Sequence, residues 1–503
     1  MKLEEFLAGK NVVAVVCNQW GDTGKGKIVD LIASEWADFI VRGTGGANAG
    51  HTINIGGEET IFHIIPSGIL HDSEGKINVI GNGVAFDPRE VVEEIEKLEK
   101  KGKTYNGLRI AYNGRLVLPQ HIVADALGEL VAGKSRIGTT MRGIGPVYSD
   151  HVARRGLFVN DMLNPDVLRS GLEKSLQMHV AVLKGMGISP TSQAFFEIMH
   201  DSRLENGAFY HQENFFDIDA IIEAYRKYGE RLKDFIADTD EIVRKARTQE
   251  KRVLLEGAQG LLLSIDYGSY PYVTSSECSI PGLAKGVGLS EKDVDLVLGV
   301  VKAPYMTRVG GGPFPTEIGG KKSEEWCSSH TRQDEEKEFA DASVNDADEF
   351  RRGVAVRRDG GEYGATTKRP RRTGWLDLPL LRYAIQVNGS DIVLTKLQVF
   401  DTADTIKICH GYIYQGDNYQ LGRRTLKRGD LLEVAIPDAE VLRHCQPLYT
   451  KFRGWKTPTA DIKDYDALPQ KLRDVVEFIE KEAGVRARIL SMGPDRNQTI
   501  IRS

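Results

Sequence analysis

The chain has 503 residues, of which 41% are hydrophobic and 27% charged, and its formal net charge is −5. These fractions are ordinary for a globular protein, and so small a net charge excludes a general attraction to nucleic acid or to an anionic membrane. The acidic N-terminus does not resemble a signal peptide, and we expect no membrane-spanning segment. The five cysteines are scattered without metal-ligand spacing, which favours reduced thiols and a cytoplasmic location.

Apolar runs typical of buried strands alternate with helical patterns along the chain. The strand-like runs cover residues 12–17, 38–41, 77–80, 252–255, 296–301, 392–397 and 487–490. The clearest helix is predicted over 88–101, with Asp87 as its N-cap and Pro88 at its first position. This alternation predicts an α/β fold in which helices flank a large, mostly parallel central sheet. We expect one domain over 1–503, with a helical subdomain at 160–250.

A glycine-rich turn follows the first strand-like run. Its glycines, Gly21, Gly24 and Gly26, free the backbone to face an anion, and Lys25 and Lys27 add positive charge. The spacing satisfies the phosphate-loop pattern up to its last position. There Ile28 replaces the Ser or Thr that usually holds Mg²⁺.

Asp22 places a carboxylate inside this phosphate loop. A carboxylate beside a bound phosphate usually has a chemical reason, such as holding a metal or accepting a proton. The competing interpretation is a turn aspartate that accepts hydrogen bonds from nearby backbone N–H groups. A second glycine-rich segment, residues 42–53, contains Gly50 and His51.

These two segments resemble the adenylosuccinate synthase family. Further motifs of that family occur in its order at residues 137–146, 152–156, 256–260, 270–276, 307–317, 373–377 and 492–496. The resemblance covers the chain from about residue 11 to the C-terminus, and it implies a fold similar to that of phosphate-loop GTPases. It also implies ligation of L-aspartate to IMP, the first committed step of AMP biosynthesis. A nucleoside triphosphate would first phosphorylate O6 of IMP, and aspartate would then displace the phosphate from 6-phosphoryl-IMP.

The resemblance implies a role for each matching residue. Asp22 matches the catalytic base and Mg²⁺ ligand, and His51 matches the general acid. Lys25 matches a lysine that contacts the phosphoryl group, and Gln259 matches the side chain that holds the 6-oxygen. Gly50 matches a second Mg²⁺ ligand, through its backbone carbonyl.

The remaining matches bind the substrates. For IMP they are Asn48, Thr140, Arg154, Gln259, Thr274, Val309 and Arg369, with Arg154 supplied by the neighbouring subunit of a homodimer. For aspartate they are Thr366, Thr367, Arg369 and Arg371, in a substrate loop over 364–372. For the donor nucleotide, GTP in this family, they are Gly21, Gly24, Lys25, Gly26, Lys27, Gly50, His51, Thr52, Arg371, Lys396, Gln398, Ser491 and Gly493.

Several positions depart from the family pattern. Thr23 replaces Glu, Met141 and Lys368 replace Gly, and Pro370 replaces Arg. Gln398 stands where the family has an Asp that reads guanine, so ATP stays open as the donor. Two other functions also stay open, a ligase acting on GMP or dGMP and a non-catalytic nucleotide-binding paralogue, although retention of Asp22 favours IMP.

Residues 319–362 are rich in charge and longer than the corresponding link in the family. We interpret them as an insertion. A solvated surface excursion is the favoured interpretation, and a structured element beside the substrate loop is the alternative.

Overall fold

The computed structural model describes residues 1–55, 58–133, 137–201, 209–364 and 368–502. Its centre is a ten-stranded sheet, parallel except at the last pair, in the order β11-β7-β5-β2-β12-β1-β13-β16-β22-β23. The strands are β1 Val12–Cys17, β2 Phe39–Arg42, β5 Ile77–Ile80, β7 Leu108–Ala111, β11 Ile236–Ala237, β12 Val253–Glu256, β13 Leu296–Lys302, β16 Asp391–Thr395, β22 Arg486–Ser491 and β23 Thr499–Ile501. The predicted α/β class with a mostly parallel sheet is confirmed.

All seven predicted strand runs lie in this sheet, with ends that differ by at most two residues from the observed ones. Their apolar side chains are buried because helices cover both faces of the sheet, as a parallel arrangement requires. The sheet also contains β7, β11 and β23, which the sequence pattern did not indicate. These strands have two to four residues each and lie toward the edges of the sheet, where a short run carries little periodic signal.

The helices alternate with the strands along the chain. They are α1 Leu3–Phe6, α2 Lys25–Glu35, α3 Pro88–Lys100, α4 Pro119–Ala132, α5 Ile144–Val152, α6 Pro165–Gly185, α7 Gln193–Asp201, α8 Ile218–Leu232, α9 Thr239–Thr248, α10 Ile280–Lys285, α11 Gly320–Ser329, α12 Arg332–Glu338, α13 Glu349–Gly360, α14 Leu378–Asn388, α15 Ala439–Arg443 and α16 Gln470–Ala483. The helix expected over 88–101 is α3. The Asp87 carboxylate accepts a hydrogen bond from the Arg89 backbone at its start, so the predicted N-cap is confirmed.

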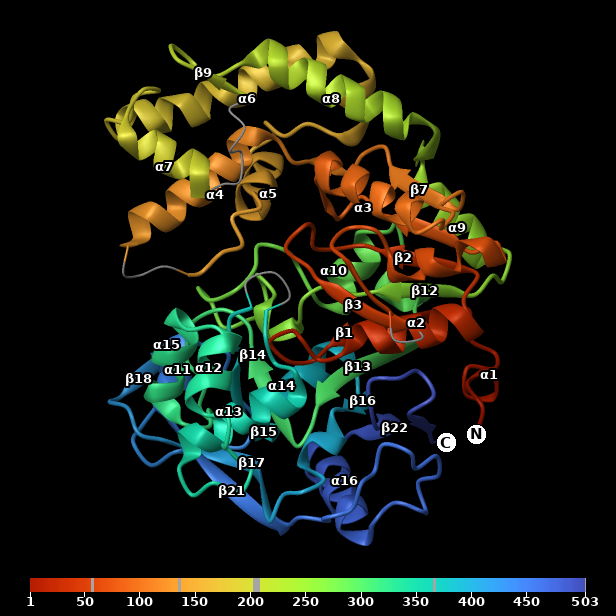
Figure 1. Cartoon of the computed structure of the whole chain (residues 1–503), viewed down its shortest axis with the longest axis vertical. Coiled ribbons are helices and arrows are strands. Elements are labelled where there is room, and N and C mark those ends of the chain that lie inside the picture. Colours follow the sequence, from red (N-terminus) through yellow and green to blue (C-terminus); the bar gives the residue numbers. More distant parts are fainter. Residues whose placement is uncertain (56–57, 134–136, 202–208, 365–367, 503) are drawn as a thin grey trace.

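Helices α4 to α8 form a layer on one side of the sheet (Figure 1). A single hydrophobic cluster runs from the sheet through α3 into this layer, and it includes Ile80, Ile95 and Tyr225. The layer therefore shares its core with the sheet. Helices α4 and α5 pack together and α4 contacts α6 and α7, whereas α9 packs against β7 and β12.

A second sheet lies on the other side of the molecule, in the order β14-β15-β17-β20, with β21 also paired to β17. Its strands are β14 Tyr305–Arg308, β15 Arg372–Asp377, β17 Thr405–Tyr414, β20 Leu431–Leu432 and β21 Cys445–Arg453. Two-stranded pairs complete the fold: β3 His51–Ile55 with β4 Glu58–Phe62, β6 Ala85–Phe86 with β8 Arg115–Leu116, β9 Tyr210–His211 with β10 Phe215–Phe216, and β18 Tyr419–Leu421 with β19 Arg424–Leu426.

Residues 319–362 fold into α11, α12 and α13, which we call the helical module. Its inward side chains, among them Phe350, Val354 and Val356, are buried in the core beside Trp375 of the second sheet. The expectation of a solvated surface excursion is therefore wrong for this side of the segment. The sequence pattern did not reveal this apolar face. A short helix has only a few inward positions, and charged residues separate them along the chain.

Within the described ranges, no helix has the length and apolar character needed to cross a membrane. All five cysteines lie in these ranges, and each is free and buried.

Candidate active site

The candidate residues converge because they follow the carboxyl ends of neighbouring parallel strands. The glycine loop follows β1, residues 43–50 follow β2, Gln259 follows β12, and Lys396 follows β16. Parallel strands bring these ends to one edge of the sheet, which is where open α/β sheets bind their ligands. Candidate residues that lie far apart in the sequence therefore meet at one site, because each of them follows a strand of the same parallel sheet.

The glycine loop has the backbone that an anion cradle needs. Gly21 and Gly24 adopt left-handed conformations, with φ of +85° and +79°, and Gly24 is the N-cap of α2. A Cβ at Gly26 would lie 2.6 Å from the carbonyl oxygen of Thr52, so only glycine lets the second loop pack this closely. The N-terminus of α2 and the paired loops thus form a positive, backbone-lined site for phosphate.

Asp22 lies at the mouth of this cradle, with 38% of its side chain exposed. The Nε atom of Arg371, which the sequence placed in the aspartate loop, lies 2.7 Å from its carboxylate. Burial raises the pKa of Asp22, but the charges of Arg371, Lys302 and Lys25 outweigh this and lower it. Asp22 is therefore ionised at neutral pH, in the state that a base or a metal ligand requires.

The two lysines of the loop contact different partners. Lys25 is buried and donates from Nζ to the carbonyl oxygen of Gln259, 3.0 Å away. Lys27 donates to the Ser491 hydroxyl and to the carbonyl oxygens of Gly493 and Gln498, each within 2.9 Å. The structure thus joins the glycine loop to the segment after β22, as the predicted donor-nucleotide residues require.

His51 belongs to a buried charged group that the sequence did not reveal. Its Nδ1 atom pairs with the carboxylate of Glu256 at the end of β12, and Ser67 donates to the same carboxylate from its backbone and its hydroxyl. Burial lowers the pKa of His51. His51, Arg42 and Ser67 together lower that of Glu256, although its burial opposes them. The carboxylate is thus charged and fixes the ring, which leaves Nε2 without a partner among the described residues.

A second polar group joins three predicted IMP residues. Gln259 donates to Asn48 over 3.1 Å, and Asn48 donates to the Thr274 hydroxyl over 3.2 Å. Ser276, which the sequence analysis did not assign, contacts both Gln259 and Thr274 at 3.4 Å. Thr140 is exposed in the loop before α5, and it lies outside this hydrogen-bonded group.

The remaining predicted residues are placed with varying detail. Val309 lies against the loop, since a Cβ on Gly21 would be 3.4 Å from it. Arg369 is exposed. Thr366 and Thr367 lie outside the described residues.

Lys396 and Gln398 follow β16, where the resemblance places the base of the donor. Lys396 donates to the carbonyl oxygen of Gly360 over 2.8 Å. Gln398 is half-buried, and its side-chain carbonyl oxygen is buried without a hydrogen-bond partner among the described residues. An unpaired buried acceptor is costly, so this oxygen suits a ligand that brings a donor.

Two departures from the family pattern keep a backbone shape that normally favours glycine. Met141 has φ of +52° and Lys368 has φ of +53°. A side chain in the left-handed region costs about 1–2 kcal/mol. The fold therefore holds both residues in place against this strain.

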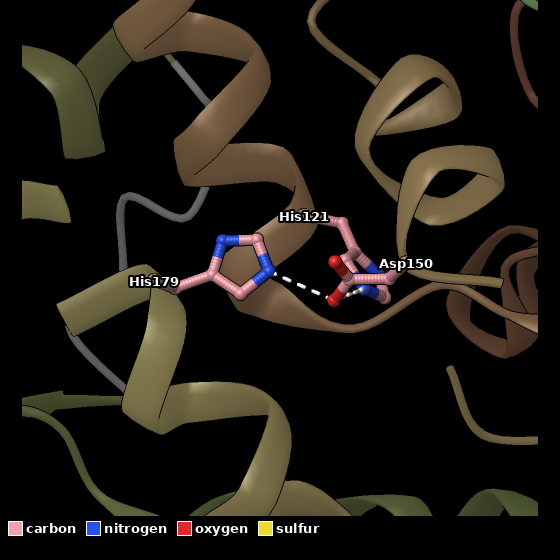
Figure 2. A group of neighbouring side chains, drawn as sticks. All are labelled: His121, Asp150 and His179. Atoms are coloured by element: carbon pink, nitrogen blue, oxygen red, sulfur yellow. Dashed lines mark hydrogen bonds and ion pairs between the residues drawn. The ribbon is translucent and has the colours of Figure 1, made fainter. Parts of the chain in front are cut away.

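Arg154 is exposed just beyond α5, with φ of +60°. Its neighbour Arg155 pairs with Asp150 at 3.0 Å. Asp150 also accepts hydrogen bonds from His121 of α4 and from Ser175 and His179 of α6. Figure 2 shows the two histidines beside the carboxylate, which ties together α4, α5 and α6.

His121, Asp150 and His179 have their ligand atoms close enough to hold a metal. The backbone N–H of Leu118 donates to Nδ1 of His121, so the neutral ring carries its proton on Nε2, the atom that faces Asp150. A protonated nitrogen cannot ligate a metal. This group is therefore a hydrogen-bond hub that positions α5.

Mg²⁺ fits the residues expected to hold it. Asp22 offers a partly exposed carboxylate, and Gly50 offers a backbone carbonyl oxygen in the second glycine-rich segment. Carboxylate and carbonyl oxygens are the hard ligands that Mg²⁺ prefers. Arg371 contacts Asp22 in this structure, so a cation and Arg371 would compete for one carboxylate.

The fold and the site first define a class of protein, an α/β protein with an ionised carboxylate and a buried imidazole beside a glycine loop of the phosphate-binding type. The sequence pattern of adenylosuccinate synthetase matches residues 14–500, and the chain belongs to that family. It is 40% identical over 494 residues to the adenylosuccinate synthetase of Thermodesulfovibrio yellowstonii, covering 98% of this chain and 99% of the relative. The corresponding enzyme of Caldicellulosiruptor bescii is 39% identical over 495 residues, covering 98% and 100%.

A solved structure agrees with this assignment. Fully ligated adenylosuccinate synthetase from Plasmodium falciparum superposes with a TM-score of 0.77 at 30% identity, covering 98% of this chain and 100% of that one. The family expected from the motifs is confirmed, and the protein is a ligase that forms a carbon–nitrogen bond.

Proposed function

We propose that the protein joins L-aspartate to IMP and forms adenylosuccinate, with GTP as the phosphoryl donor and Mg²⁺ as cofactor. The observation that carries this proposal is that Lys25 bonds to Gln259 of the Asn48–Gln259 group and lies close enough to an ionised Asp22 and a carboxylate-fixed His51 for its charge to act on both. The named relatives support it along their whole length.

The first step needs a base at N1 of the purine. The ionised Asp22 carboxylate accepts this proton, and negative charge then develops on O6. O6 attacks the terminal phosphorus of the donor, and the bond from that phosphorus to the nucleoside diphosphate breaks. Lys25 supplies positive charge at the transferring group. When bound, Mg²⁺ compensates charge on the donor phosphates.

The second step forms the carbon–nitrogen bond. The amino group of aspartate attacks C6, the C6–O6 bond breaks, and phosphate leaves with that oxygen. Nε2 of His51 has no hydrogen-bond partner among the described residues, and the Glu256 carboxylate on Nδ1 stabilises the ring when it becomes protonated. Because burial favours the neutral ring, His51 first takes up at Nε2 a proton that the attacking amine releases, and it then donates this proton to the departing oxygen. Arg369 and Arg371 hold the carboxylates of aspartate, a role that suits planar guanidinium groups.

We also propose a homodimer in which Arg154 reaches the IMP phosphate of its partner's site. Its exposure beyond the Asp150 hub supports this, because the hub fixes the helix that carries it. Mixing an Arg154→Leu variant with an Asp22→Ala variant would then restore turnover, since each hybrid dimer keeps one intact site. If hybrid dimers form and turnover stays absent, the shared site is wrong. We place the enzyme in the cytoplasm, which its free, buried thiols support.

The test of the activity is product formation by the purified protein with Mg²⁺, aspartate and each pairing of IMP, GMP or dGMP with GTP or ATP. We expect adenylosuccinate from IMP with GTP. If product forms from GMP or dGMP and none forms from IMP, the substrate is GMP or dGMP and the proposal of IMP is wrong. Nucleotide binding with no product in any pairing would make the protein a non-catalytic member of its family.

A further inference from the structure

The helical module contacts both described arms of the substrate loop. The incoming arm, residues 362–364, follows α13, and the outgoing arm, residues 368–371, leads into β15. Backbone hydrogen bonds join the arms, from Gly364 to the carbonyl oxygen of Arg369 at 2.8 Å and from Arg371 to that of Glu362 at 2.9 Å. The position of either arm therefore sets the position of the two arginines.

Glu335 of α12 holds the incoming arm. Its carboxylate is buried, with one oxygen 2.6 Å from the Arg357 guanidinium of α13. The other oxygen accepts a hydrogen bond from the Tyr363 hydroxyl at 2.9 Å. A charge-assisted contact of this kind orders the group that makes it more strongly than a neutral one.

The start of α12 holds the outgoing arm. The Arg332 backbone N–H donates to the carbonyl oxygen of Lys368 over 3.1 Å, and the Arg332 guanidinium lies 5.3 Å from the centre of the Tyr363 ring. Lys368 is the residue in the left-handed conformation. The contact from α12 helps to hold that strained residue, so one helix fixes both arms.

The incoming arm is also anchored on the two sheets, through Glu362. Glu362 accepts hydrogen bonds from the buried Lys302 at 2.7 Å and from the Tyr305 hydroxyl at 2.5 Å. Its anchorage on β13 and β14 makes the base of the loop rigid. The hydrogen bond from Tyr363 to Glu335 is a side-chain contact between module and loop that the removal of one hydroxyl breaks.

We propose that Glu335 and Tyr363 are positioning residues that set the affinity for the dicarboxylate substrate by placing Arg369 and Arg371. The inference rests on the proposed function, since it assigns aspartate to this loop. It gives the helical module a role in substrate selection. Neither residue touches a reacting atom in this assignment.

Tyr363→Phe tests this, because it removes one hydroxyl and keeps the ring. We expect the KM for aspartate to rise about five- to tenfold, with kcat and the KM values for IMP and GTP within twofold of wild type. The matched control is Tyr419→Phe, which removes a hydroxyl that donates to the Asp438 carboxylate over 3.0 Å, in the β18–β19 pair. It should leave all four constants unchanged.

A double-mutant cycle with Glu335→Gln separates positioning from general damage. If Tyr363 acts through Glu335, the two substitutions will not add. The KM for aspartate in the double variant will then be no higher than that of whichever single variant has the higher KM. An unchanged aspartate KM in folded Tyr363→Phe, or an equal rise in all three KM values, would overturn the proposal. A wild-type protein that makes no adenylosuccinate would instead refute the proposed function.

Discussion

The two sides of the active site differ in how far they are organised without ligand. On the nucleotide side, Asn48, Gln259 and Thr274 already hydrogen-bond to one another, and Glu256 fixes His51. On the aspartate side, Arg369 is exposed and Arg371 pairs with Asp22. The proposed nucleotide half is therefore preorganised, whereas Arg371 on the proposed aspartate side would have to leave its ion pair with Asp22 to bind the substrate.

This difference has a physical origin. The nucleotide residues extend from the ends of adjacent strands, whose positions the sheet fixes. The aspartate arginines extend from a loop whose geometry depends on the helical module. Rigid elements hold functional groups more closely than loops do, so we expect changes on the nucleotide side to affect kcat and changes in the loop to affect the KM for aspartate.

The largest effect should come from the residue where the two sides meet. Asp22→Ala removes the base and a metal ligand together, so we expect kcat to fall by about 10³-fold or more. Asp22→Asn keeps the shape and should lose nearly as much. Steady-state turnover measures this, and a kcat within tenfold of wild type in either variant would contradict the assigned role.

The next largest effect should come from a substitution on the nucleotide side alone. Glu256→Gln removes the charge that stabilises a protonated His51, and we expect kcat to fall by about 100-fold with the KM for aspartate unchanged. The matched control is Glu94→Gln, at another buried glutamate that accepts backbone hydrogen bonds. Burial raises the pKa of Glu94 to about 7, so neutralising it should change kcat by less than about threefold. Equal losses in both variants would make Glu256 merely structural.

A smaller effect concerns pH at the donor site. Burial lowers the pKa of Lys27 to about 7, with Asp495 opposing and Lys463 contributing. As pH rises from 7 to 8.5 the empty site loses the positive charge of Lys27 beside the proposed phosphate site, so the Kd for GTP should rise by about tenfold. Calorimetry across this range measures the change. Lys27→Arg keeps its charge, and its Kd should stay flat; a wild-type Kd that is equally flat would refute the linkage.

The smallest effect concerns the donor base. An amide can present either a donor or an acceptor, so Gln398 should discriminate weakly between GTP and ATP. Gln398→Asp should raise the ratio of kcat/KM for GTP over ATP by about fivefold, because a carboxylate accepts from both guanine donors, N1–H and the 2-amino group, whereas adenine presents an acceptor at N1. If the wild-type protein already has the same ratio of kcat/KM for GTP over ATP as the Asp variant, another part of the pocket determines the base specificity.

Local sequence patterns predicted what short-range geometry controls. The seven strand runs and Asp87 at the start of α3 were correct because each depends on a few neighbouring residues. The module at 319–362 was misjudged for the opposite reason. Its helices are stabilised by a core that they share with distant strands, and the chain's local charge gives no sign of that core.

The sequence by itself determined the family, the phosphate loop, the positions of Asp22 and Gln259 shortly after strands, and the position of His51 in the second glycine-rich segment. These follow from motifs whose residues are close neighbours in the sequence. Only the tertiary structure decided which distant residues meet them: Glu256 with His51 across 205 positions, Arg371 with Asp22, and Glu335 with Tyr363. The physical reason is that parallel strand order and helix packing choose these pairs, and neither is written in the spacing of a motif.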